Sequence, residues 1–177
     1  MADAAACAGR VARLRELMAD RGYDAVILRN NPDLRWLTGA ERTFDDEVAH
    51  TAFITADGQW LHTDSRYFNT FRERLGADTP WQIDEDMTTP AAWAAARAAQ
   101  TRSRVVAVED TCDLAFFDAF LHECNAASIA CLTPRLHDDI CDLRMIKDAE
   151  EVELMRHAQT ITDAAFDHIC GFLKPGL

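Results

Sequence analysis

Apolar residues in the first part of the chain follow two different periods. Between Arg10 and Arg21 they recur every three or four positions, which is the spacing of an amphipathic helix, and Gly22 follows as a C-cap. The next apolar run, residues 24–29, is short, contains β-branched members and ends at an Asn-Asn-Pro turn. This pattern predicts a helix with one buried stripe and then a strand buried on both faces.

A β-hairpin is the clearest local signal in the chain. Residues 51–55 and 59–63 flank Ala56-Asp57-Gly58, where the Asp-Gly pair supplies the positive φ that a tight turn needs. One or two helical turns are expected at 31–39, and a charged loop, 40–50, separates them from the hairpin. That loop is longer than a plain hairpin turn requires, which motivates the hypothesis of a functional role.

Helices and strands alternate through the following segments. We expect, in order, a helix capped by Asp64, a strand at 80–83, an alanine-rich helix at 91–100, a strand at 104–109, a helix capped by Asp113 and a last strand at 128–132. This alternation predicts a three-layer α/β domain with helices on both faces of a mixed, mainly parallel sheet that contains one hairpin.

A long helix is predicted after residue 148. Asp148 and Glu151 form a capping box, and apolar residues then advance by three or four positions as far as Phe172. About 25 helical residues make a rod of roughly 37 Å, which is long for a small domain. The pattern alone fits two alternatives equally: a last helix packed on its own sheet, or a helix whose partner surface lies outside these 177 residues.

Composition narrows the possible classes of protein. The net charge of -12 disfavours nucleic acid as a partner, because phosphate binding relies on Lys and Arg. The six cysteines are irregularly spaced without a Cys-x-x-Cys motif, which indicates buried thiols rather than a disulfide framework. We find no signal sequence and no long apolar run, so we expect a cytoplasmic protein with no membrane partner and a disordered segment at 1–9.

A series of segments, taken together and in order, resembles one known family. They are residues 24–28, 31–39, 53–58, 61–67 and 143–158, the last of which contains Leu143-Arg144-Met145-Ile146-Lys147, and then Leu173-Lys174-Pro175-Gly176. They are similar to the amino-terminal domain of the creatinase, prolidase and aminopeptidase P family of metallopeptidases. The resemblance covers nearly the whole chain.

This resemblance implies a protein of two domains with different roles. In the family, the front domain has a ribonuclease-H-like α/β fold and is non-catalytic, while the chemistry lies in a pita-bread domain that follows it. We therefore expect a creatinase-type domain at 10–142, and a linker with the first helix of a truncated catalytic domain at 143–177. The principal partner of this chain would be its own missing C-terminal catalytic domain.

The resemblance also implies where the metals belong. Peptidase members bind two divalent ions, such as manganese, cobalt or zinc, through two Asp, one His and two Glu that lie beyond the Lys-Pro-Gly landmark. None of these ligands maps onto this chain, and its six histidines form no His-Glu-x-x-His motif. We expect no catalytic residue, metal or cofactor in the chain, which would not be an enzyme by itself.

The expected parent is an Xaa-Pro peptidase that cleaves the bond before proline. The alternative is a non-peptidase relative: creatinase, or a non-enzymatic binding or chaperone scaffold with the same fold. Family members usually form homodimers, and in creatinase an aromatic residue and an arginine from the loop before the hairpin reach the partner's substrate. We expect Arg42 and Phe44 to line the partner's substrate entrance; the alternative is a mobile solvent loop.

Overall fold

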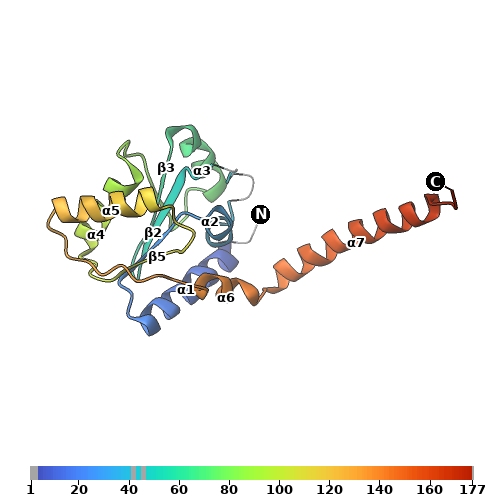
Figure 1. The fold of residues 1–177 in the computed structure, drawn as a ribbon, viewed down its shortest axis with the longest axis horizontal. Helices are drawn as coiled ribbons and strands as arrows, with labels where there is room; N and C mark the ends of the chain where they lie inside the picture. The colour runs from blue at the N-terminus through green and yellow to red at the C-terminus, as the bar shows by residue number, and fades with distance from the viewer. Residues whose placement is uncertain (1–3, 41–42, 45–46, 177) are drawn as a thin grey trace. The chain divides into compact units, whose positions relative to one another are not determined.

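The computed structural model of the protein describes residues 4–40, 43–44 and 47–176. Internal contacts divide the chain after Leu143 into two compact units, and each unit is described by itself. The first unit contains a five-stranded sheet with helices, and the second contains one long helix. Figure 1 shows the elements of both units.

The first helix, α1 (Ala4–Arg21), begins earlier than expected. The sequence predicts a helix from Arg10 and disorder at 1–9, but residues 4–9 are helical and Cys7 is buried on the same face as Val11 and Leu14. The alanines at the start of α1 have the highest helix propensity of all residues, which favours helix formation through residues 4–9. The expected disorder at 4–9 is therefore wrong.

The sheet is mixed, as predicted, and has the order β4-β3-β2-β1-β5. β2 is antiparallel to both β1 and β3, whereas β5 is parallel to β1 and β4 is parallel to β3. Among the described strands, parallel and antiparallel pairs are thus equally represented, so the sheet is not mainly parallel as expected. The strands are β1 (Ala25–Leu28), β2 (His50–Thr55), β3 (Gln59–Thr63), β4 (Gln82–Asp84) and β5 (Val106–Val108).

The hairpin between β2 and β3 is present as predicted, but neither Asp57 nor Gly58 has the positive φ that the sequence analysis expected of this pair. The amide of Thr55 donates to the carbonyl of Gly58 at 2.9 Å, and the Thr55 hydroxyl accepts from the amides of Asp57 and Gly58. Gly58 is required for a steric reason, because a Cβ there would lie 2.1 Å from the Trp60 ring. Hydrogen bonding by one threonine and the absence of a side chain at Gly58 together fix this turn.

Helices cover both faces of the sheet, which makes the three predicted layers (Figure 1). In β1, Val26 and Leu28 pack into one core and Ala25 and Ile27 into the other, because successive strand side chains point to opposite faces. The first core includes side chains of α1, α2 (Asn31–Thr38), α3 (Phe68–Leu75) and α6 (Asp139–Met145). The second core includes side chains of α4 (Pro90–Thr101) and α5 (Leu114–Ala126).

Side-chain caps are present at the starts of three helical segments, and those at Asp64 and Asp113 were predicted. Asp113 accepts from the amide of Phe116 at 2.7 Å, and Thr89 accepts from the amide of Ala92. Asp64 accepts from the amide of Arg66, but it caps a short 3₁₀ turn, η1 (Ser65–Tyr67), that precedes α3. Each acceptor satisfies an amide that the helix itself leaves without a partner.

The region after α5 differs from the prediction. The expected strand at 128–132 is absent; residues 132 and 135 instead make isolated parallel bridges to Val105 and Val108. Pro134 lies between these bridges and has no amide hydrogen to donate, so a regular ladder is interrupted there. The short helix α6 that follows was not predicted.

The second unit consists largely of α7 (Ala149–Phe172), a helix of 24 residues. The capping box is formed as predicted: Asp148 accepts from the amide of Glu151 at 2.8 Å, and Glu151 accepts from the amide of Asp148 at 2.9 Å. Described by itself, α7 buries none of its residues. In the described part of the chain, each helix is too short or too polar to cross a membrane.

The exposed apolar residues of α7 share one face of the helix. At 3.6 residues per turn, the large ones fall on one side of the helix, while charged residues such as Glu153, Arg156 and Asp163 occupy the opposite face. We call this face the α7 stripe. Its large members are Leu154, Met155, Ile161, Phe166, Ile169 and Phe172, each more than half exposed.

Candidate functional site

The loop before the hairpin is the site that the sequence singles out, and the structure describes part of it. Arg42 lies outside the described residues. Phe44 is described, and its ring is buried, with 4% of its surface exposed. The ring packs edge-on against His50 at 5.1 Å and Phe71 at 5.2 Å between ring centroids, and its carbonyl accepts from Arg35 of α2. Within this chain, Phe44 anchors the loop to the core.

The anchor belongs to a cluster of aromatic rings. His50 at the start of β2 also contacts Tyr67, with ring centroids 4.8 Å apart, and its Nδ1 lies 2.7 Å from the Thr63 hydroxyl on β3. Because β2 and β3 are paired, this cluster fixes the end of the loop to the sheet. An entrance role for Phe44 in an assembled enzyme stays a prediction.

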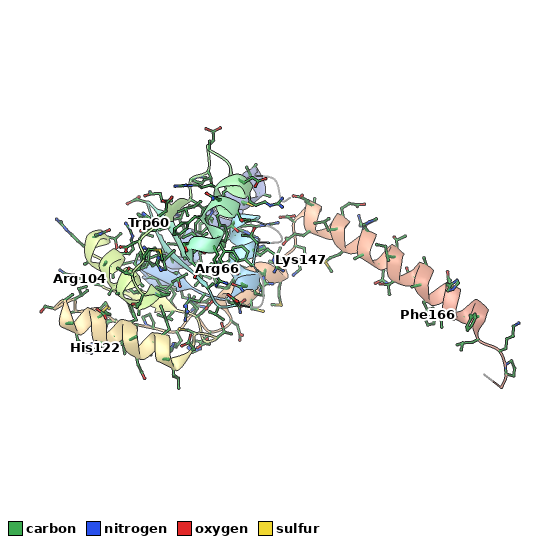
Figure 2. All side chains as sticks on the ribbon, turned by 90° about the horizontal axis from the view of Figure 1, so that it is seen from above. Trp60, Arg66, Arg104, His122, Lys147 and Phe166 are labelled. Atoms are coloured by element: carbon green, nitrogen blue, oxygen red, sulfur yellow. The ribbon has the colours of Figure 1, made fainter. Side chains whose placement is uncertain are left out.

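Beyond the anchor, the loop carries an exposed charge cluster. Arg66 of η1, labelled in Figure 2, pairs with Glu47 at 2.8 Å and Asp64 at 3.0 Å. Hydrogen bonds to Asp64 and Glu47 hold the pKa of Arg66 above its usual value, while the Arg66 amide and side chain hold the pKa of Asp64 below its own. Exposed pairs of this kind contribute little stability, so we assign the cluster an orienting role at the end of the loop.

A second candidate site lies where β1 and β5 end. These strands are parallel neighbours, and a cavity of about 380 Å³ is lined by residues that directly follow them. Arg29 follows β1, and Glu109 follows β5. In open α/β sheets, ligands characteristically bind at the carboxyl ends of parallel strands. The other lining residues are Asn30, Asn31, Pro32, Val48, Thr111, Cys112 and Asp113.

Buried charges dominate this second site. The Arg29 guanidinium pairs with Asp113, donates to the Thr51 hydroxyl at 3.3 Å and lies 4.2 Å from the centre of the Phe116 ring. Glu109 accepts from the amide of Arg29 at 2.7 Å. Burial raises the pKa of Glu109 to about 7, although the amides of Asn30 and Arg29 and the Arg29 charge oppose this shift.

Sequence analysis missed the second site because its parts are far apart along the chain. Arg29 and Glu109 meet only because β1 and β5 are adjacent, a pairing that the pattern of apolar residues does not specify. One signal was available: a charged residue directly follows each of two strands buried on both faces. The site is therefore predictable only in combination with the sheet order.

The described residues contain no cluster of side chains that could bind a metal ion. Over 4–40, 43–44 and 47–176, no three His, Cys, Asp or Glu side chains are placed to hold one ion. The described part of this chain therefore does not fit the two-metal centre expected of the parent.

Comparisons with known proteins identify relatives of the chain. Residues 10–146 match the creatinase/prolidase N-terminal domain family. An uncharacterised peptidase of Bacillus subtilis, YqhT, is 26% identical over 174 residues, which is 95% of this chain and 44% of that protein. The chain thus spans less than half the length of this curated relative.

Two solved structures share the fold. An Xaa-Pro dipeptidase from Bacillus anthracis matches with a TM-score of 0.81 and 22% identity over 97% of this chain and 45% of that one. The N-terminal domain of the cytoplasmic peptidase PepQ from Mycobacterium tuberculosis matches with a TM-score of 0.62 and 19% identity over 76% of this chain and 98% of that one. At these identities, the likeness establishes the fold.

Proposed function

Because the chain belongs to the creatinase/prolidase N-terminal domain family, we propose that it is the non-catalytic front domain of an Xaa-Pro metallopeptidase. In this proposal, the parent hydrolyses the peptide bond before proline and holds two divalent metals through residues outside this chain. The front domain supports homodimer assembly and substrate access. The observation that carries the proposal is the family match over residues 10–146, in a chain that spans 44% of its curated relative.

The α7 stripe supports the proposal that the parent has a catalytic domain outside this chain. Six large apolar side chains exposed along one helix face are far more than scattered surface residues, and such a patch typically marks an interaction surface. Each large apolar side chain stabilises the protein by about 1.5–3 kcal/mol when it becomes buried. We propose that the stripe docks onto the catalytic domain of the parent.

Arg42 provides the test of substrate access. In the full-length parent, we expect Arg42→Ala to lower kcat/KM on an Xaa-Pro peptide about tenfold, the loss that corresponds to about 1.4 kcal/mol of transition-state stabilisation. Arg42 is the informative position because the Phe44 ring is buried, so truncation there would act through the stability of the fold. Kinetic constants and Tm are measured together.

Arg104 is a matched control for this substitution. Arg104 is exposed, and it lies on the segment before β5 (Figure 2). We expect Arg104→Ala to leave kcat/KM unchanged. If Arg42→Ala also leaves kcat/KM unchanged at constant Tm, the access role is refuted.

A further inference from the structure

Two cysteines lie in contact near the end of α5. Cys124 is in the last turn of the helix, Cys131 follows the turn after it, and their sulfur atoms are 3.8 Å apart. Cys124 is buried, whereas Cys131 is partly exposed. Both are free thiols in this structure. The pair therefore combines one accessible sulfur, on Cys131, with a buried sulfur in contact with it, on Cys124.

The backbone holds both cysteines in place. The amide of Ile129 donates to the carbonyl of Cys124 at 2.8 Å, and the neighbouring Leu132 exchanges hydrogen bonds with Arg104 and Val106 beside β5. A disulfide has an S–S length of about 2.05 Å, so each sulfur needs to move by only about 0.9 Å from its present position. Side-chain rotations supply displacements of this size without a change of fold.

We propose that Cys124 and Cys131 are a reversible oxidation site that forms an intramolecular disulfide by exchange with a small disulfide such as oxidised glutathione. In the first step, the Cys131 thiolate attacks one glutathione sulfur, the glutathione S–S bond breaks, and one glutathione leaves and takes up a proton. In the second step, Cys124 loses its proton to solvent and attacks the Cys131 sulfur, which releases the second glutathione. Two protein thiols are oxidised and one small disulfide is reduced to two thiols.

The environment of the pair sets the order of these steps. Burial, together with the adjacent Cys131, raises the pKa of Cys124 to about 12, so its thiol stays protonated near neutral pH. Cys131 is partly exposed whereas Cys124 is buried, so Cys131 is the sulfur that a small disulfide reaches first. Ring closure by Cys124 is then the slow step. At pH values below the pKa of Cys124, the rate of closure increases about tenfold when the pH is raised by one unit.

Closure has a structural consequence for the first unit. The bond links the end of α5 to the segment that bridges to β5, across a turn in which Ser128 has a φ of 56°. A cross-link over so short a loop stabilises the fold mainly by restricting the unfolded chain. We expect Tm to rise on the order of 5 °C on oxidation.

The test uses the 177-residue chain with its exposed thiols removed by Cys141→Ser and Cys170→Ser. After incubation with oxidised glutathione, we expect mass spectrometry to show the loss of two hydrogens and a cross-linked peptide that joins Cys124 to Cys131. Dithiothreitol should restore both thiols and reverse the rise in Tm. Adding Cys112→Ala, which changes a half-buried thiol outside the pair, should leave closure intact.

Two single variants separate the steps. We expect Cys124→Ala to retain one glutathione on Cys131, and Cys131→Ala to acquire none at the buried Cys124. Two results overturn the proposal in the chain with the pair intact: a glutathione adduct that persists on Cys131, or both thiols remaining free at high ratios of oxidised to reduced glutathione. Because these results are obtained without substitution of the pair, misfolding of a variant cannot produce them.

Discussion

Ile161→Glu is expected to lower the free energy of unfolding of the full-length parent by at least about 3 kcal/mol and to abolish most of its peptidase activity. Ile161 lies in the middle of the α7 stripe and is 60% exposed in this chain. If the stripe docks onto the catalytic domain, the substitution loses the buried isoleucine and also places a carboxylate in an apolar interface. In the 177-residue chain, the same change should alter stability by less than about 0.5 kcal/mol, as surface substitutions do.

Thr160 offers a matched control on the other face of the same helix. It is exposed and lies outside the α7 stripe, so Thr160→Glu adds the same charge to the same turn. Urea unfolding and peptidase assays of both full-length variants measure the effect. If Ile161→Glu and Thr160→Glu behave alike in the full-length protein, the stripe is not a docking surface.

Glu109 is expected to make the stability of the first unit depend on pH between about pH 5 and about pH 8. The folded state raises the pKa of this carboxyl from 4.5 to about 7, so folding favours its protonated form. The stabilisation is fully present below the unfolded pKa of 4.5 and is lost as the pH rises through about 7. The upper limit of the loss is about 3 kcal/mol.

Glu109→Gln removes this ionisation while it keeps an oxygen that accepts the Arg29 amide. We expect the stability of wild type relative to Glu109→Gln to fall as the pH rises through this range, as measured by urea unfolding. His62 acts in the opposite direction, because burial lowers its pKa and its contribution therefore grows as the pH rises. The difference between the two proteins cancels the contribution of His62.

An exposed acid serves as the reference for this measurement. Glu16 on α1 is exposed, and Glu16→Gln should show the pH dependence of wild type. A constant difference in stability between wild type and Glu109→Gln across the range would show that the carboxyl is not perturbed by its burial.

Much of the fold could be predicted because local chemistry determines it. The capping box of Asp148 and Glu151, the Asp57-Gly58 turn and the cap at Asp113 each involve residues within a few positions of one another. The alternation of apolar runs likewise identified the strands that are buried on both faces. The strand predicted at 128–132 is absent because only Leu132 makes a bridge, to Val105, and Pro134 interrupts a ladder two positions later.

The candidate sites depended on information that is not local. Phe44 was expected at an entrance because it lies in a polar loop, and only the folded chain reveals that His50 and Phe71 surround its ring. The meeting of Arg29 with Glu109 likewise requires the order of strands in the sheet. Sequence patterns therefore located elements and caps well, but not the contacts between residues tens of positions apart.

The most direct test of the proposed role is a comparison of hydrolysis by two polypeptides. The 177-residue chain and the full-length parent are incubated separately with an Xaa-Pro dipeptide and an Xaa-Pro-Xaa tripeptide in the presence of manganese, and release of the first residue is measured. We predict hydrolysis by the full-length protein and none by the chain alone. Hydrolysis by the chain alone, or the absence of any in a folded full-length protein, would contradict the account.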